Sequence, residues 1–404
     1  MPLQAPGRSP LTMTRAGARA RLAAEDPGRG HQLALRCGAS PSALETEVLR
    51  SGVRSFCRAA AVLAAGAVIL AFAASPARAA PSSYVALGDS YSSGTGTGTY
   101  LQDGTSCQRS VRAYPSLVAS SRGMALNFRA CSGATVADVT RVQLSALRTG
   151  TAHVSVSVGG NDAGFAAVLT ECAKPAWASN CNGAVDGAQS IINARLPGRL
   201  SSLYAAIRSR APRARVVVVG YPRLFNGEDC NLLTWFSPGE ASRLNATSDL
   251  LNTKIRAAAR GAGFTFSSPT STFRGHAVCD DPEWINGLSR PISESFHPNR
   301  LGQSAGYAPL VGTALAGPPV LSTAQTTQQA LASTTRLTEQ QRRHAVVDQT
   351  IRPQEFRVPD LSSPPVERAA ERAGVDLRSR ASIDAVDRTY AAKQARARGS
   401  KADQ

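Results

Sequence analysis

The sequence predicts an α/β fold whose central sheet is mostly parallel. Between residues 81 and 316, short runs rich in β-branched residues alternate with longer stretches of helical periodicity. Strands that alternate with helices are typical of a parallel sheet covered by helices. Polar clusters of Gly, Ser, Asn and Asp also recur where the predicted strands end, and ligands bind at that edge of such sheets.

Five strands and three helical stretches are predicted in this region. The clearest strand is 215–219, because its valine run is continuous and is closed by a Gly-Tyr-Pro turn. The other strands are shorter or weaker, and they lie at 84–87, 126–130, 154–158 and 264–266. Helical periodicity is best developed at 184–209 and 240–262, and a last helix is predicted at 303–316.

An apolar run near the N-terminus predicts export. Residues 59–74 are uncharged, basic residues precede them, and small residues around Ala77 and Ala79 follow. A basic region, a short apolar region and a small-residue cleavage site make up a secretory signal peptide. A membrane anchor is the alternative, but the run is shorter than the roughly 20 residues that span a bilayer. We therefore assign 54–80 to the signal peptide of a secreted, extracellular protein.

The residues before this signal contain scattered Arg, Pro and Gly and show little periodicity. We expect 1–53 to be an unstructured extension. Because a signal peptide normally begins at the N-terminus, we also expect translation to begin near Val48 or Val53.

The composition changes again after residue 316. The segment 317–404 is rich in Gln, Thr, Arg and Ala, and Phe356 and Tyr390 are its only aromatic residues. Helical stretches at 338–347 and 366–396 lack a broad apolar face. We therefore expect a polar, basic tail that is flexible or weakly helical.

The charge pattern argues against a nucleic-acid partner. The formal net charge of +17 is spread along the chain, and no block of five or six like charges occurs. Proteins that bind nucleic acid usually have a clustered basic patch or a known module. An arginine-rich, solvated surface explains the excess equally well.

Six cysteines follow the predicted signal peptide, which suits disulfides in an exported protein. They are Cys107, Cys131, Cys172, Cys181, Cys230 and Cys279. Fifteen pairings are open in principle. Pairing neighbours along the chain gives 107–131, 172–181 and 230–279, and each bond would stabilise the fold by about 2–4 kcal/mol. A zinc site is the alternative, although no CxxC pair occurs and His276 is the only histidine nearby.

The first polar block, Gly88-Asp89-Ser90, follows the first predicted strand. On its own, the serine could be a helix cap. Further blocks with Gly133, Asn161 and His297 follow later elements. A serine hydroxyl needs a base to become a nucleophile, and a histidine near neutrality can take its proton. The backbone N–H groups of Ser90 and Gly133 and the amide of Asn161 could then stabilise an oxyanion.

These four blocks, in this order and spacing, resemble the SGNH (GDSL) hydrolase family, and the closer likeness is to secreted streptomycete lipases, esterases and phospholipases A1. The resemblance covers 82–316. It implies a flavodoxin-like three-layer α/β/α sandwich with a mostly parallel five-stranded sheet. It also implies hydrolysis of carboxylic esters of acyl lipids through an acyl-enzyme on Ser90, with His297 as base and no cofactor or metal. As a group, the similar enzymes also pair six cysteines sequentially.

The resemblance leaves three candidates for the residue that orients His297. Many SGNH enzymes place an Asp three residues before the histidine, where this chain has Glu294. Some of the similar lipases use the main-chain carbonyl two residues before it, which here belongs to Ser295. We favour the Ser295 carbonyl, and the carboxylates of Glu294 and Asp280 are the alternatives.

The remaining expectations concern supporting residues and substrates. Asp89 and Asp162 are expected to hold loops. His276 is a candidate for the wall of the cleft, and Trp284 is a candidate either for that wall or for ordinary packing. We expect a monomer without a stable membrane span that acts on a lipid or small ester. Phospholipase A1 and carbohydrate acetyl esterase are alternative activities, and a non-catalytic secreted binding protein is the alternative outside the enzymes.

Overall fold

The computed structural model describes residues 80–318 and 320–402. The predicted extension at 1–53, and all of the predicted signal peptide except residue 80, lie outside these residues. Within the described part of the chain, no helix is both long and apolar enough to cross a membrane.

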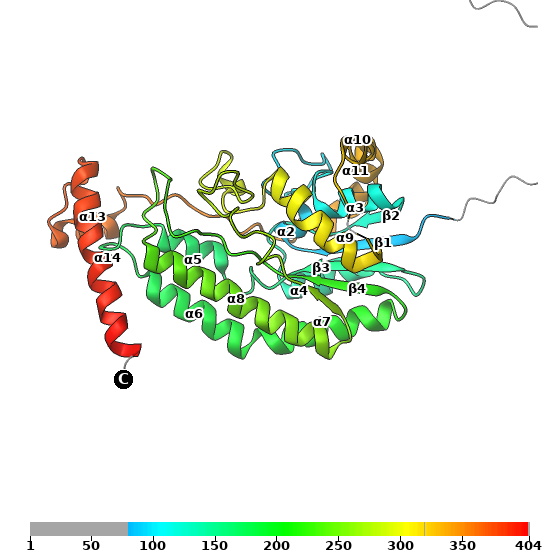
Figure 1. Cartoon of the computed structure of the whole chain (residues 1–404), viewed down its shortest axis with the longest axis horizontal. Coiled ribbons are helices and arrows are strands. Elements are labelled where there is room, and N and C mark those ends of the chain that lie inside the picture. Colours follow the sequence, from blue (N-terminus) through cyan, green and yellow to red (C-terminus); the bar gives the residue numbers. More distant parts are fainter. Residues whose placement is uncertain (1–79, 319, 403–404) are drawn as a thin grey trace, which may run out of the picture. The chain divides into compact units, whose positions relative to one another are not determined.

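A five-stranded sheet lies at the centre, and all its neighbouring strands are parallel (Figure 1). Its order, β2-β1-β3-β4-β5, is that of flavodoxin-like sheets, which bind ligands where the order reverses, between β1 and β3. The strands are β1 (Ser83–Gly88), β2 (Ala125–Phe128), β3 (His153–Ser157), β4 (Arg215–Val219) and β5 (Thr265–Ser267). The predicted fold class is therefore confirmed.

Helices cover both faces of the sheet. One face is covered by α3 and α9, and the other by η1, α7 and α8 (Figure 1). Up to the end of the sheet region the helices are α2 (Ser90–Ser93), α3 (Tyr114–Arg122), α4 (Val136–Asp138), η1 (Val139–Gln143), η2 (Leu144–Ala146), α5 (Phe165–Cys172), α6 (Cys181–Ala194), α7 (Leu196–Arg210), α8 (Pro238–Gly261), η3 (Ile292–Glu294), η4 (Gly302–Tyr307) and α9 (Ala308–Ala316).

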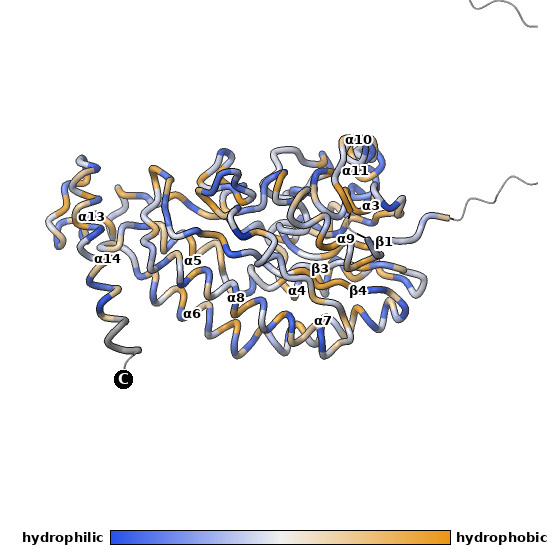
Figure 2. The backbone as a smooth tube through the Cα atoms, viewed as in Figure 1, coloured by the Kyte–Doolittle hydropathy of each residue, from blue (hydrophilic) through white to orange (hydrophobic). Residues whose placement is uncertain are grey.

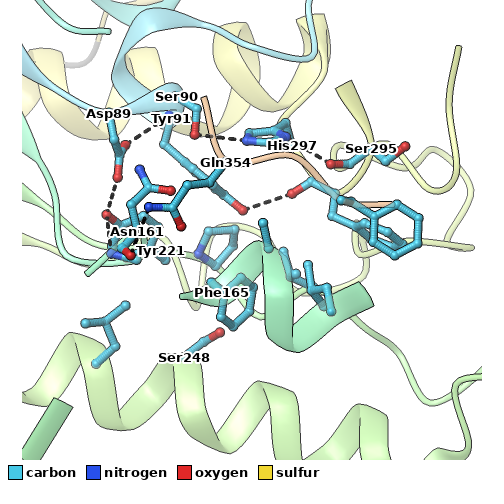
Figure 3. A pocket seen from close by; sticks show the side chains of 18 residues that line it. Asp89, Ser90, Tyr91, Asn161, Phe165, Tyr221, Ser248, Ser295, His297 and Gln354 are labelled. Carbon is cyan, nitrogen blue, oxygen red and sulfur yellow. Dashed lines mark hydrogen bonds between the residues drawn. The ribbon is translucent and has the colours of Figure 1, made fainter. Parts of the chain in front are cut away.

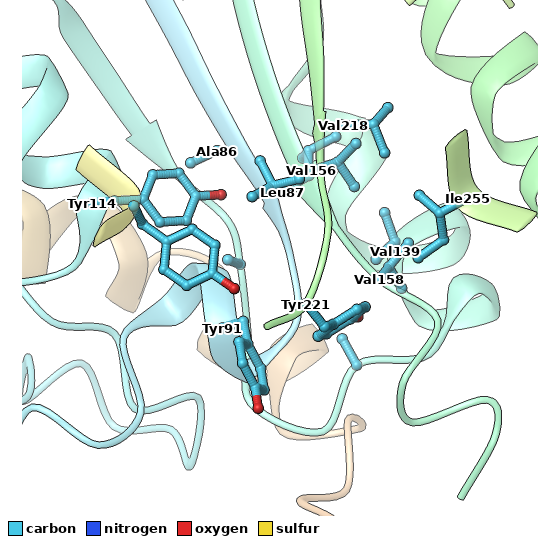
Figure 4. Packing of buried hydrophobic residues seen from close by; sticks show 14 of the residues in the cluster. Ala86, Leu87, Tyr91, Tyr114, Val139, Val156, Val158, Val218, Tyr221 and Ile255 are labelled. Carbon is cyan, nitrogen blue, oxygen red and sulfur yellow. The ribbon is translucent and has the colours of Figure 1, made fainter. Parts of the chain in front are cut away.

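The core forms because the strands are buried on both faces. The strand β4 and the helix α9 are mainly apolar along their length (Figure 2). Val156 and Val218 of the sheet lie near Val139 of η1 and Ile255 of α8, and all four are buried (Figure 4). Burial of such a side chain stabilises the fold by about 1.5–3 kcal/mol.

The helix predicted at 184–209 is two helices, α6 and α7, which meet at Arg195. Pro197 lies in the first turn of α7. Proline has no N–H group and its ring clashes with the preceding turn, so it is tolerated only where a helix begins. The chain therefore starts a new helix at this point.

The six cysteines after the predicted signal peptide all form disulfides, and the pairing of neighbours along the chain is confirmed. The bonds join Cys107 to Cys131, Cys172 to Cys181 and Cys230 to Cys279. The second bond links the end of α5 to the start of α6. Since every one of these sulfurs is oxidised, none is left as a thiolate ligand for zinc.

The tail differs from the flexible or weakly helical segment expected at 317–404. It folds into α10 (Ala324–Ala332), α11 (Thr334–Arg342), α12 (Ala345–Asp348), α13 (Pro364–Ala373) and α14 (Arg380–Ala402). Its helices need no broad apolar face, because small side chains of α13 pack against two tryptophans that precede the tail, Trp177 and Trp235.

A buried ion cluster also holds the tail. The carboxylate of Asp348 accepts hydrogen bonds from Arg109 at 2.6 Å and from Arg129 at 2.7 and 3.0 Å. All three side chains are fully buried. The tail thus supplies the anion shared by two arginines that lie outside it.

Candidate active site

The predicted site residues meet at the carboxyl edge of the sheet, beside the point where the strand order reverses. Ser90 opens α2 directly after β1, and Asn161 lies in the turn after β3. Gly133 lies in the loop after β2, and His297 lies in the loop between η3 and η4. Figure 3 shows Ser90, Asn161 and His297 around one cavity.

Ser90 and His297 form a hydrogen-bonded pair. Nε2 of His297 lies 2.9 Å from Oγ of Ser90, and Nδ1 lies 2.9 Å from the carbonyl oxygen of Ser295 (Figure 3). A carbonyl can only accept, so Nδ1 carries the proton and Nε2 of the neutral ring presents a lone pair to the serine hydroxyl. This is the tautomer that a general base requires.

The two carboxylates considered for orienting His297 have other partners. A carboxylate oxygen of Glu294 accepts a hydrogen bond from the Tyr100 hydroxyl at 2.7 Å. Asp280 accepts from the Asn226 amide at 3.0 Å and from a backbone N–H at 2.6 Å. Among the described residues, no carboxylate is hydrogen-bonded to the imidazole.

Burial keeps the imidazole neutral. It lowers the pKa of His297 to about 4, although the hydrogen bond to the Ser295 carbonyl opposes this shift. A neutral carbonyl fixes the ring but stabilises an imidazolium less than a carboxylate does. The ring is therefore neutral, and able to accept a proton, above about pH 4.

Three N–H donors lie on the strand ends around Ser90. The backbone N–H groups of Ser90 and Gly133 have no acceptor among the described residues. The side-chain amide of Asn161 donates one hydrogen to the Ala134 carbonyl at 3.0 Å, which fixes its plane. Its second hydrogen has no partner in the described part of the chain. Gly133 has φ +84°, a conformation that favours glycine.

Asp89 holds the turn that presents Ser90. Its carboxyl accepts hydrogen bonds from the Tyr91 N–H at 3.1 Å and from the Tyr221 hydroxyl at 2.5 Å. Burial raises the pKa of Asp89 to about 7. The Tyr221 hydroxyl also accepts from the Gly160 N–H at 3.2 Å, so it ties the turn after β1 to the turn after β3. Motif reasoning missed Tyr221, because no sequence pattern links it to Ser90.

Asp162 supports the neighbouring turn, on which Asn161 lies. One carboxylate oxygen accepts from the Val136 N–H at 2.9 Å, and the other pairs with Arg199 at 3.2 Å. Asp162 thus has contacts that suit the loop-holding role expected of it.

Apolar side chains line the cavity next to this pair. They come from α5, the turn after β4, α8 and the His297 loop, and they include Phe165, Leu169, Leu224, Leu251 and Phe296. Two further lining residues, Gln354 and Phe356, belong to the tail. An isolated phenylalanine in a polar tail was the only sequence signal for this contribution.

Two candidates for the cleft wall lie elsewhere. The rings of His276 and Trp284 stack on each other with centroids 3.8 Å apart. Neither residue lines the cavity that contains Ser90. Both are therefore explained by packing in their own loop.

The sheet and the geometry of the site are those expected of an ester hydrolase. The model of the GDSL-like Lipase/Acylhydrolase family matches residues 86–305, and the chain belongs to this family. The protein is accordingly a carboxylic ester hydrolase.

Known relatives agree with this assignment. The chain is 43% identical over 258 residues to Lipase 1 of Streptomyces coelicolor and 42% identical over 262 residues to a lipase of Streptomyces rimosus. These alignments cover 63% of this chain and 95% and 96% of the relatives.

Two crystal structures share the fold at 40% identity. They are an extracellular lipase of S. rimosus, with a TM-score of 0.54, and phospholipase A1 of Streptomyces albidoflavus NA297, with a TM-score of 0.55. Each match covers 58% of this chain and 99% or 100% of the solved chain.

Proposed function

We propose that this protein is a secreted serine esterase or lipase that cleaves carboxylic esters through an acyl-enzyme on Ser90. The observation that carries the proposal is the 2.9 Å contact between Nε2 of His297 and Oγ of Ser90, with the ring held in the required tautomer. The apolar lining of the cavity supports an acyl group as the part of the substrate that enters.

In the first half-reaction, His297 takes the hydroxyl proton while Oγ of Ser90 bonds to the ester carbonyl carbon. The carbonyl oxygen becomes an oxyanion, which the N–H groups of Ser90 and Gly133 and the Asn161 amide stabilise. The imidazolium then gives its proton to the leaving alcohol as the ester C–O bond breaks.

In the second half-reaction, water attacks the acyl-enzyme and His297 accepts one of its protons. The tetrahedral intermediate is stabilised by the same donors. Its collapse releases the carboxylic acid, and the proton returns to Oγ of Ser90. The Ser295 carbonyl keeps the imidazole in place during both halves, so the proposed machinery is a dyad steered by the backbone.

Secretion is the second part of the proposal. It is supported by the predicted signal peptide at 54–80, by three disulfides, which persist in oxidising compartments, and by the extracellular lipase among the related structures.

Phospholipase A1 activity is the second candidate, and it is favoured by the related phospholipase structure. The chemistry at Ser90 would be the same, and only the alcohol side of the ester would differ. Release of fatty acid from the sn-1 position of phosphatidylcholine would distinguish this activity.

The proposal is tested by steady-state kinetics on p-nitrophenyl esters from acetate to palmitate. We expect turnover by the wild type, and a Ser90→Ala variant with kcat reduced by about 10⁴-fold or more. Ser93→Ala is a matched control, because Ser93 is buried in the same helix and contacts no imidazole. Ester hydrolysis by Ser90→Ala at the wild-type rate would refute the proposal.

A further inference from the structure

Residues 351–358, which we call the C-terminal strap, lie directly against the catalytic site. The backbone of Arg352 and Pro353 packs on Gly133 so closely that a Cβ at position 133 would overlap the Arg352 carbonyl. The side-chain amide of Gln354 donates to the Asn161 carbonyl at 3.3 Å (Figure 3).

The aromatic end of the strap covers the residue next to His297. The ring of Phe356 packs edge-on against Phe296, with centroids 4.9 Å apart, and Phe356 is buried. The strap thus touches two predicted oxyanion-hole residues and the chain neighbour of the base.

The strap is fixed at both ends. It begins at Ile351, which is buried in the main core, three residues after Asp348 and its two buried arginine partners. Beyond the strap, α13 and α14 pack on Trp177 and Trp235. Figure 1 shows this orange segment running between the two sets of tail helices. Because the chain is anchored on both sides of the strap, the strap is held in place against the site.

The strap leaves little room for an acyl chain. The cavity beside Ser90 has a volume of about 50 Å³. A single water needs about 10–15 Å³ on this measure, so the cavity offers about four such positions. An acyl chain of a few carbons can lie wholly inside this space, and a fatty acyl chain would have to extend beyond it.

Phe356 lines both this cavity and a second, more open space. The same side chain lines an open groove of about 720 Å³, together with Leu232, Leu233, Leu288 and Ile292. Leu232 is 81% exposed and Leu233 is 49% exposed. Removing the ring of Phe356 would therefore enlarge the space available to an acyl chain on the side of the groove.

We propose that the C-terminal strap sets the acyl-length specificity of this hydrolase, and that Phe356 closes the acyl cavity so that esters of short carboxylic acids are the preferred substrates. The inference rests on the proposed function. The family model ends at residue 305, and the relatives are matched over nearly their whole length by 58–63% of this chain. The strap is therefore outside the region that defines the family.

The test compares the full-length wild type with Phe356→Leu and Phe356→Ala on p-nitrophenyl acetate, butyrate, octanoate and decanoate. We expect the wild type to lose kcat/KM beyond about butyrate. Phe356→Ala should raise kcat/KM for decanoate by about tenfold or more, since a few methylene groups in an apolar site are worth at least that factor. Phe356→Leu should give a smaller rise, and acetate should change by about twofold or less.

Phe273→Ala is the matched control, because Phe273 is a buried phenylalanine that lines neither the catalytic cavity nor the groove beside the strap. Circular dichroism of each variant reports whether it is folded. If Phe356→Ala does not fold, the chain-length profile of Phe356→Leu decides the test.

Three results would overturn the inference. They are a wild-type optimum at octanoate or longer, an unchanged chain-length profile in both Phe356 variants, and an equal rise for every ester, which would make the strap a general obstruction. A wild type that hydrolyses none of the esters would instead defeat the proposed function.

Discussion

Replacing Asn161 by alanine isolates one donor of the proposed oxyanion hole. The substitution removes both side-chain hydrogens, of which one is held by the Ala134 carbonyl at 3.0 Å and the other has no partner in the described part of the chain. Loss of one such donor costs about 2.7–4 kcal/mol of transition-state stabilisation, which corresponds to about 10²–10³ in kcat.

The loss should fall on kcat and leave KM nearly unchanged, because the donor acts on a charge that exists only in the transition state. The fold should lose only about 1 kcal/mol, the worth of the hydrogen bond to Ala134. Steady-state kinetics on p-nitrophenyl butyrate and urea unfolding measure the two effects separately.

Asn182→Ala is the control, since Asn182 lies in α6 and does not line the cavity. A kcat within about threefold of wild type for Asn161→Ala, or an effect confined to KM, would refute the assignment of Asn161 to the oxyanion hole.

Three further predictions concern the base, its titration and the tail. Glu294→Gln should keep kcat within about threefold, because its carboxylate accepts a hydrogen bond from Tyr100. A carboxylate that accepted from the imidazole Nδ1–H would be worth about 10⁴ in kcat, so a loss of several orders of magnitude in steady-state assays would show a carboxylate triad. Burial lowers the pKa of His297 to about 4, so the imidazole stays neutral as the pH falls and kcat/KM should decline only near pH 4. A pH–rate profile in which kcat/KM falls with a midpoint at pH 6.5 or above would contradict this. Asp348→Ala leaves two buried arginines without their shared anion, so the free energy of unfolding measured in urea should fall by about 3–5 kcal/mol. Asp360→Ala, at an exposed position, is the control and should leave this free energy unchanged. Equal stability of the two variants would mean that the cluster does not anchor the tail.

The fold was predictable because its signals are local. The valine run of β4 and the helical period of α8 lie within single elements, and each was predicted to within a few residues. The break between α6 and α7 does not follow from the helical period, which continues across it, and only Pro197 marks it locally.

The site was predictable only in part. Ser90 and His297 each belong to short motifs, and the structure brings them into contact across 207 residues. Tyr221 has no motif, and its bond to Asp89 spans 132 residues. Such a contact follows from the packing of the turns at the sheet edge, and no local pattern around Asp89 or Tyr221 predicts it.

The ordered structure of the tail could not be predicted from its own sequence for a related reason. The anion of Asp348 meets Arg109 across 239 residues, and a lone aspartate in a polar segment does not predict burial. A signal did exist in α13, where Val366, Ala369 and Ala370 follow helical spacing and all three are buried. This apolar stripe is a weak sequence signal because two of its three residues are alanines. The tryptophans against which it packs belong to another part of the chain.

The central claim is that Ser90 is the nucleophile of this hydrolase, and covalent trapping tests it most directly. A p-nitrophenyl alkylphosphonate with a short alkyl group should release one p-nitrophenolate per chain as Oγ of Ser90 bonds to phosphorus. We predict a single adduct by intact-mass spectrometry, mapped to the peptide that contains Ser90, formed in step with loss of esterase activity and absent in Ser90→Ala. An active enzyme that takes up no label, or that carries it on another residue while Ser90 stays free, would contradict the account.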